Sequence, residues 1–313
     1  MSNRIYKYVG HSYLDKVFKP EDNVTLKCSY PKDFNDPYEL FLTINYNERP
    51  EVLAFYADAV GELPQLPITC FSRSPAVIPM WAHYAETLQG FCIEFDEQLL
   101  GQFFPESAFG DVDYEDTPSA GLADTLYRAY EIGKPRYIHF LRKGVFSAAY
   151  YTKATCWNYE QERRMIVKES ETRLIDELIL MDVPKECITG LIVGPRASAV
   201  TIRAIREVAK QIGCRHFQLK IGRTSPNPFF VDEDGKSFIF SGTEIEFSSQ
   251  FCSTCKEPIS NESKQCSWCR IKEVHKEDAA MRNPYRMLAH CGLLESYIES
   301  VQVIDRRIRN SED

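Results

Sequence analysis

The sequence predicts an α+β fold: a mixed, mainly antiparallel sheet with flanking helices, followed by a C-terminal zinc ribbon and a helix. Three observations lead to this prediction. Short segments rich in β-forming residues recur along most of the chain, helical segments lie between them, and four cysteines form two close pairs near the end. Because the composition shifts near residue 248, we expect a main domain over 1–248, a zinc ribbon over 249–275 and a helical tail over 276–313.

Composition bounds the class of protein. The 313 residues are 44% hydrophobic and 12% aromatic, as in a folded globular chain. The net charge of −8 gives no overall basic field, so binding to nucleic acid would need a local patch. The sequence has no apolar signal segment and no run long enough for a bilayer. Most of its 11 cysteines are dispersed singly, which is typical of reduced thiols, so we expect a cytoplasmic protein.

The first half of the main domain alternates strands with helices and turns. Strands are predicted from β-rich, alternating segments at 4–9, 23–29, 67–72 and 90–96. Helices are predicted at 51–62 and 122–150, with a break at 133–135, where a proline follows a glycine and a lysine. A short helix or turn is expected at 80–86, a structured turn at 31–39 and an acidic loop at 105–120.

Residues 156–167 are interpreted as the central strand of the main domain. In an extended chain, Asn158, Glu160, Glu162 and Arg164 share one face. Two neighbouring carboxylates repel each other unless cations or water relieve the repulsion, and either a substrate site or a salt-bridged strand edge would account for them. Lys153, Arg163 and Arg164 are near enough in sequence to supply that relief.

In the second half of the main domain, the sequence pattern predicts three further strands and a hairpin. Strands are expected at 177–183, 188–194 and 214–220, and a helix over 198–211 completes a strand–helix–strand unit. Residues 229–240 predict a hairpin because Asp234-Gly235 lies between two β-rich segments.

Two other stretches carry candidate binding residues. Trp81, His83 and Tyr84 fall within four positions, a density that suits stacking on a planar ring, although a histidine beside aromatic residues is more often part of a core. Asn35 and Asp36 lie in the 31–39 turn, where short polar side chains commonly bond to their own backbone.

The cysteine pairs are the most specific motif. Cys252 and Cys255 form one Cys-x-x-Cys pair, and Cys266 and Cys269 form the next. Two such pairs supply the four thiolates of a tetrahedral site, so the sequence predicts a structural Zn²⁺ with no open position for chemistry.

In the C-terminal tail, the pair Asn283-Pro284 is a favourable helix start, and one helix is predicted after it. Its end is basic, with Arg306, Arg307 and Arg309, which suits the helix dipole. A zinc ribbon followed by a basic helix also suits contact with nucleic acid or another protein.

Several phrases occur together in one order: Tyr6-Lys7-Tyr8, the 34–39 turn, the 80–85 segment, the 90–95 strand and the 157–163 segment. As a set over about residues 4–245, they resemble a large bacterial family of domains of unknown function, which supplies no reaction. The cysteine pairs lie outside this resemblance.

A more distant resemblance is to ADP-ribosyltransferases. The resemblance implies NAD as cofactor, Glu162 as the catalytic glutamate and Glu160 as the group that activates the acceptor. It places Lys7 at the basic residue of the first motif, and Ser72 and Tyr84 near the middle motif. The residues expected around the cofactor or substrate are therefore Lys7, Tyr8, Ser72, Trp81, His83, Tyr84 and Arg163, with Asn35, Asp36 and Lys153 from loops.

The leading hypothesis is an ADP-ribosyltransferase-like toxin or defence effector that acts on nucleic acid or protein. Glu162 would stabilise the oxocarbenium ion and Glu160 would be a general base. A metal-dependent nuclease built from Asp36, Glu39, Glu160 and Glu162 is the second hypothesis. The third is a non-catalytic binding module that recognises its partner through the tail.

Overall fold

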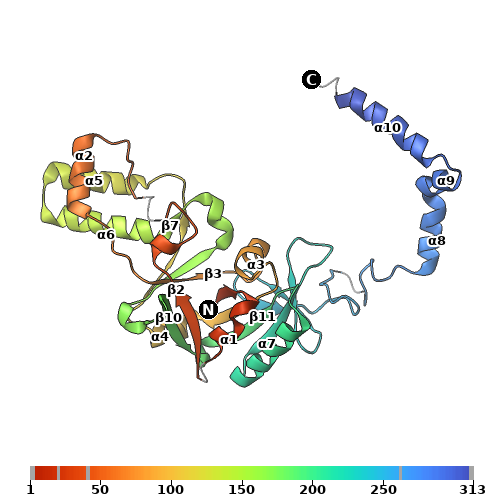
Figure 1. Ribbon diagram of the computed structural model, residues 1–313, viewed down its shortest axis with the longest axis horizontal. Coiled ribbons are helices and arrows are strands. Elements are labelled where there is room, and N and C mark those ends of the chain that lie inside the picture. The colour runs from red at the N-terminus through yellow and green to blue at the C-terminus, as the bar shows by residue number, and fades with distance from the viewer. Residues whose placement is uncertain (1–3, 20–21, 40–42, 261–262, 310–313) are drawn as a thin grey trace. The chain divides into compact units, whose positions relative to one another are not determined.

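The computed structural model describes residues 4–19, 22–39, 43–260 and 263–309. It divides into two compact units, Met1–Ser249 and Gln250–Asp313. Figure 1 shows the elements of each unit.

A ten-stranded sheet forms the centre of the first unit. Its strands lie in the order β15 (Ile245–Phe247), β14 (Ser237–Phe240), β13 (Phe229–Val231), β12 (Arg215–Lys220), β11 (Ile188–Val193), β4 (Phe91–Asp96), β1 (Arg4–Val9), β3 (Ile68–Ser72), β8 (Glu162–Ile166) and β5 (Ala108–Asp111). All neighbouring pairs are antiparallel except β11 and β12, which run parallel. The fold is therefore α+β with a mainly antiparallel sheet, as predicted.

The parallel pair is joined by helix α7 (Ala199–Ile212), which confirms the predicted strand–helix–strand unit (Figure 1). The Ser198 side chain caps the helix by accepting a hydrogen bond from the Thr201 N–H. The helix ends at Gly213, whose left-handed backbone (φ 78°) costs little without a Cβ.

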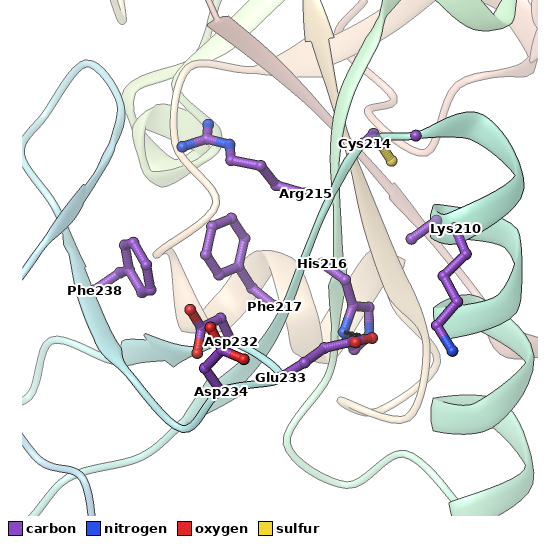
Figure 2. A pocket seen from close by; sticks show the side chains of 11 residues that line it. Lys210, Cys214, Arg215, His216, Phe217, Asp232, Glu233, Asp234 and Phe238 are labelled. Carbon is purple, nitrogen blue, oxygen red and sulfur yellow. Dashed lines mark ion pairs between the residues drawn. The ribbon is translucent and has the colours of Figure 1, made fainter.

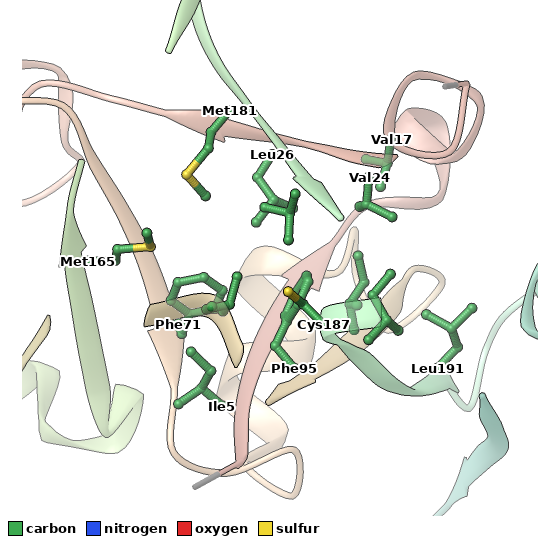
Figure 3. Close-up of a cluster of buried hydrophobic side chains, with 14 of the residues drawn as sticks. Ile5, Val17, Val24, Leu26, Phe71, Phe95, Met165, Met181, Cys187 and Leu191 are labelled. Atoms are coloured by element: carbon green, nitrogen blue, oxygen red, sulfur yellow. The ribbon is translucent and has the colours of Figure 1, made fainter. Parts of the chain in front are cut away.

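A second sheet of three strands covers part of the first. It has the order β2 (Asn23–Cys28), β10 (Leu178–Pro184), β9 (Arg173–Ile175). Leu26 and Met181 of this sheet belong to the same buried cluster as Phe71 and Phe95 of the large sheet (Figure 3). Removing this apolar surface from water stabilises the contact between the sheets.

A separate group of helices has its own apolar cluster. Helices α2 (Pro50–Val60), α5 (Ala120–Ile132) and α6 (Pro135–Tyr151) pack around residues that include Val52, Leu126 and Leu141. Gly133, in the left-handed conformation, separates α5 from α6 and confirms the predicted break.

The remaining described elements of the first unit are short. They are α1 (Leu14–Val17), α3 (Ile78–Tyr84), α4 (Glu97–Phe103), β6 (Asp113–Tyr114), β7 (Thr152–Lys153) and the 3₁₀ helices His11–Tyr13, Pro31–Asp33, Thr155–Glu160, Glu169–Glu171 and Lys185–Cys187.

Two predictions within the first unit were wrong. Residues 156–167 are not one central strand: a 3₁₀ helix ends at Glu160, Gln161 adopts a left-handed backbone, and β8 begins at Glu162 next to the edge strand β5. The stretch 105–120 is not all loop, because β5 pairs with β8 and β6 pairs with β7. Which residues become strand in these two stretches depends on pairing with strands that are distant in sequence. Local composition does not predict such pairing.

The second unit holds the cysteine pairs and three helices, α8 (Glu273–Arg282), α9 (Pro284–His290) and α10 (Leu294–Arg309). The Asn283 side chain caps α9, which begins at Pro284 as predicted. The prediction of one continuous helix was wrong, because the chain breaks around Gly292 (φ 72°). Among the described residues, no helix combines the length and the apolar character that a membrane crossing requires.

Candidate active site and metal centre

The large sheet brings three distant polar residues into one row. Tyr6 of β1 lies directly opposite Ser72 of β3, and Ser72 lies directly opposite Glu162 of β8. Residues directly opposite each other in neighbouring antiparallel strands point to the same face. The row therefore forms one polar floor from residues that are far apart in sequence.

This floor belongs to a cavity of about 330 Å³. The cavity is lined by Tyr6, Lys7, Tyr8, Lys27, Ser29, Asp33, Phe34, Asn35, Cys70, Phe71, Ser72, Met80, Tyr84, Lys153, Glu160 and Glu162. Eight of these were predicted as site residues from the sequence: Lys7, Tyr8, Asn35, Ser72, Tyr84, Lys153, Glu160 and Glu162.

The Glu162 carboxylate is buried between two cations. Arg164 donates to it from Nε at 2.9 Å and from Nη2 at 3.2 Å, and the Lys153 Nζ lies 3.6 Å away. Burial alone would raise the pKa of Glu162, but the charges of Arg164 and Lys153 outweigh burial and lower the pKa to about 2. Glu162 is therefore a fixed anion at neutral pH.

Glu160 meets the same lysine from the other side. Its Oε2 accepts from Lys153 Nζ at 2.7 Å, and its Oε1 accepts from the Tyr84 hydroxyl at 2.5 Å. Asn35 Nδ2 donates in turn to the Tyr84 oxygen at 3.1 Å. The two carboxylates thus converge on Lys153, although a strand does not place them side by side.

The left-handed residue between the carboxylates explains this geometry. Gln161 has φ 45° and ψ 51°, so the chain turns sharply between the 3₁₀ helix and β8. Ser72 Oγ fixes the turn by donating to the Glu160 carbonyl at 2.7 Å. Such strained backbone persists where the surrounding contacts hold it.

Arg164 connects the cavity floor to the 31–39 turn. Its Nη1 donates to Glu39 Oε1 and to the Tyr150 carbonyl, the latter at 2.8 Å. Burial raises the pKa of Glu39, and Arg164 only partly offsets that effect. Glu39 is buried and does not line the cavity.

Lys7 supplies a second amine to the cavity. Its Nζ donates to the Cys70 carbonyl at 2.8 Å and to Thr69 Oγ1 at 3.1 Å. Burial lowers the pKa of this amine, so it is more easily deprotonated than an exposed lysine.

Four residues predicted for the site lie elsewhere. Trp81 is fully buried, its Nε1 donates to the Pro75 carbonyl at 2.8 Å, and its ring meets Tyr8 edge-on, so it is a core residue that cannot stack on a ligand. His83 is exposed and contacts Tyr84 and Tyr159 outside the cavity.

The other two are held by contacts that do not involve the cavity lining. Arg163 points away from Glu162 and pairs with Glu97 at 2.5 Å, as strand alternation requires. Asp36 is buried and accepts from the Tyr38 N–H at 2.9 Å, which is the turn role considered for it.

Sequence reasoning did not identify Lys27 or Phe34 as cavity residues. Lys27 comes from β2, in the other sheet, and no local pattern reports that neighbour. The Phe34 ring centre lies 5.6 Å from the Arg164 guanidinium, a contact between residues far apart in sequence that only the fold brings about.

The four cysteines of the second unit could hold a metal ion such as zinc. Their sulfur atoms all lie within 4.8 Å of one another, and the Cys255 and Cys266 sulfurs are 3.8 Å apart. Four sulfurs at about 2.3 Å from one Zn²⁺ have tetrahedral edges of about 3.8 Å, so the donor set fits.

Comparison with known proteins finds a family model that matches a segment containing part of the cavity lining. Residues 80–165 match the model of DUF2971, a protein family of unknown function. The DUF2971 match confirms the predicted resemblance to domains of unknown function. The matched range, 80–165, is shorter than the range of about 4–245 over which the resemblance was expected. It includes Tyr84, Lys153, Glu160 and Glu162 and excludes the cysteine pairs. No curated protein and no solved structure matches the chain.

Proposed function

We propose that the first unit is an ADP-ribosyltransferase-like enzyme that cleaves the nicotinamide–ribose bond of NAD and transfers ADP-ribose to an acceptor. The single observation that carries the proposal is the Glu162 carboxylate, which lines a cavity and is held as an anion by Arg164 and Lys153.

A fixed anion suits this bond cleavage. As nicotinamide leaves, positive charge develops on the ribose ring, and a carboxylate already oriented in a largely buried site stabilises that charge without reorganising. Glu162 is 5% exposed and its two partners fix its direction. Its low pKa keeps the charge available over the whole physiological pH range.

Glu160 is the group that takes the acceptor proton. The acceptor attacks the ribose carbon while nicotinamide departs with the bond's electron pair, and the acceptor's proton passes to the Glu160 carboxylate. Tyr84, which bonds to Glu160 Oε1 and lines the cavity, holds that carboxylate in place.

The cavity size supports binding of one end of NAD. A volume of about 330 Å³ lies at the lower end of the range of ligand sites, roughly 300–1,000 Å³, so it suits nicotinamide and its ribose better than the whole dinucleotide. Tyr84 and Phe34 supply aromatic surface within the cavity. Stacking was expected of Tyr84 and Trp81, and of these two only Tyr84 lines the cavity. The Lys27 ammonium, and that of Lys7 when it is protonated, are suited to contact a phosphate.

The test is incubation of the full-length protein with NAD labelled in the adenosine part and a mixture of cellular protein, RNA and DNA. We expect nicotinamide release and transfer of label, both reduced at least 100-fold in Glu162→Gln. Glu39→Gln is the matched control, because it also removes a buried partner of Arg164 but lies outside the cavity. Equal activity of wild type and Glu162→Gln, or no turnover by a folded wild-type protein, would overturn the proposal.

The nuclease hypothesis makes a different prediction in the same assay, namely cutting of RNA or DNA that requires an added divalent ion. Its proposed ligands are engaged otherwise: Glu39 and Glu162 bond to Arg164, Glu160 to Lys153, and Asp36 to its own turn. The binding-module hypothesis predicts that Glu162→Gln retains full binding to its partner.

For the second unit we propose a structural zinc ion held by Cys252, Cys255, Cys266 and Cys269. All four ligand positions of the ion would be filled, so it would stabilise the fold and carry out no chemistry. The tail that follows would present the target or partner, a nucleic acid or a protein, to the enzyme.

A further inference from the structure

A second cavity of about 390 Å³ lies in the first unit (Figure 2), and none of its lining residues belongs to the proposed active site. It is formed by the C-terminal end of α7, the first residues of β12 and the turn that follows β13. The residues that matter for its chemistry are Lys210, Arg215, His216, Asp232, Glu233 and Asp234.

His216 is the unusual member of this cavity. Its side chain is only 7% exposed, and neither ring nitrogen has a hydrogen-bond partner among the described residues. Buried polar groups are nearly always hydrogen-bonded, so two ring nitrogens without a protein partner in a cavity wall are open to bonding with a water, an ion or another ligand.

Glu233 lies on the cavity side of His216. Glu233 lies in the turn that follows β13, two residues beyond Val231, which pairs with Gln218 of β12. Its Oε1 is 3.7 Å from His216 Nδ1, a pair that Figure 2 draws beside the helix.

We propose that His216 and Glu233 form a binding site for a divalent transition-metal ion, separate from the four cysteines. Two donors bonded to one Zn²⁺ at about 2.0–2.2 Å are about 3.4 Å apart at a tetrahedral angle, close to the separation observed. Imidazole and carboxylate are also a donor pair that such ions accept. An organic ammonium would hold its two acceptors farther apart, because each N–H···O contact is about 2.9 Å long.

The charges around the site both favour and oppose a cation. Asp232 and Asp234 add two carboxylates, although both also interact with Lys236, and the C-terminal end of α7 contributes the negative end of its dipole. Lys210 and Arg215 oppose a cation, and Arg206 Nε lies 3.1 Å from Glu233 Oε1, where it competes directly.

Among the described residues, only the cysteines bring three or more candidate ligand atoms within reach of one ion. The His216 site therefore has two protein donors and completes its coordination with water. We expect an exchangeable ion with much lower affinity than the cysteine site. Ni²⁺ is an appropriate probe because imidazole is a ligand that this ion accepts.

The test uses the full-length, tag-free protein with its cysteine site first loaded with zinc and excess metal removed. Titration calorimetry with Ni²⁺ is expected to show one further equivalent bound, and the His216→Gln variant is expected to lose it. Glu233→Gln, on an exposed turn that leaves the sheet intact, should weaken binding at least tenfold, whereas Arg206→Gln should tighten it. His139→Gln, an exposed histidine of α6, is the matched control and should bind as wild type.

The proposal is overturned if the zinc-loaded wild type binds no Ni²⁺ at millimolar concentration. It is also overturned if His216→Gln and Glu233→Gln both bind Ni²⁺ as tightly as the His139→Gln control. Proton–nitrogen NMR of the imidazole side chains supplies a second readout, since the His216 ring signals must broaden first on adding Ni²⁺.

Discussion

The ionised state of Glu162 links the active-site geometry to the acid stability of the protein. Its pKa is lowered from 4.5 to about 2 in the folded protein, so the unfolded chain binds the proton more tightly. The stabilisation from this carboxylate is complete above pH 4.5 and is lost as the pH falls toward 2. The shift corresponds to a loss of about 3 kcal/mol in the free energy of unfolding.

Urea unfolding at several pH values between 6 and 2.5 checks this prediction against Glu162→Gln. At pH 6 the variant should be less stable by about 3–5 kcal/mol, because Arg164 then keeps Glu39 as its only buried ion-pair partner and Lys153 loses the charge of Glu162. The difference should shrink as the pH falls, since only the wild type loses a charge at this position. A difference that stays constant over the range would show that Glu162 is not ionised as described.

At the scale of the elements, the junction between the 3₁₀ helix and β8 is the strained point of the site. Gln161 is exposed and has a left-handed backbone, which costs an L residue about 1–2 kcal/mol. Gln161→Gly relieves that strain but adds backbone entropy to the unfolded chain, so we expect a small net stabilisation, at most about 1 kcal/mol. Gln161→Val should instead destabilise, because β-branched residues fit this conformation worst.

Thermal unfolding of the two variants beside wild type measures the effect. We expect the unfolding midpoint of Gln161→Gly to equal or exceed that of wild type, and the midpoint of Gln161→Val to be clearly lower. The reverse order would mean that the left-handed turn does not exist in solution. Because Glu160 and Glu162 meet at Lys153 through this turn, the valine variant should also lose the proposed NAD activity.

The same junction shows what local sequence could and could not predict. The predicted alternation of side chains between the two faces of the strand is confirmed within Glu162–Ile166. Glu162 and Arg164 are buried on one face, and Arg163 pairs with Glu97 on the other. The 3₁₀ helix Thr155–Glu160 was not predicted, because its six residues show no clear hydrophobic period and are compatible with a strand or a helix. The cavity residue Lys27 was missed because its neighbours depend on the packing of one sheet on another.

On the scale of the first unit, the row that begins at Glu162 continues across the sheet. Beyond Ser72 and Tyr6 it reaches Glu94, whose buried carboxylate accepts from the Tyr6 hydroxyl at 3.1 Å and from Arg215 Nη2 at 2.8 Å. Tyr6 lines the proposed active site and Arg215 lines the His216 cavity. No local period in the sequence could predict this row, which depends on the register of neighbouring strands.

On the scale of the whole chain, the two units differ in what stabilises them. The apolar clusters found among the described residues all lie within the first unit. In the described part of the second unit, the only buried apolar side chains are those of Cys252 and Cys266. A segment with so little apolar burial depends on metal binding, which contributes about 10–16 kcal/mol in small zinc modules.

We therefore expect metal removal to act on one unit alone. Chelation, or the change Cys266→Ser, should release the backbone hydrogen bonds of the cysteine segment, such as Cys252 N–H to the Glu257 carbonyl, so that its amides exchange rapidly. Amides in the strands of the large sheet should keep their protection, and NAD turnover by the first unit should persist. Hydrogen exchange read by mass spectrometry distinguishes the two regions. Unchanged protection of the 250–272 segment after verified metal loss would contradict the structural role, while simultaneous loss of protection in the large sheet would show that the units do not fold independently.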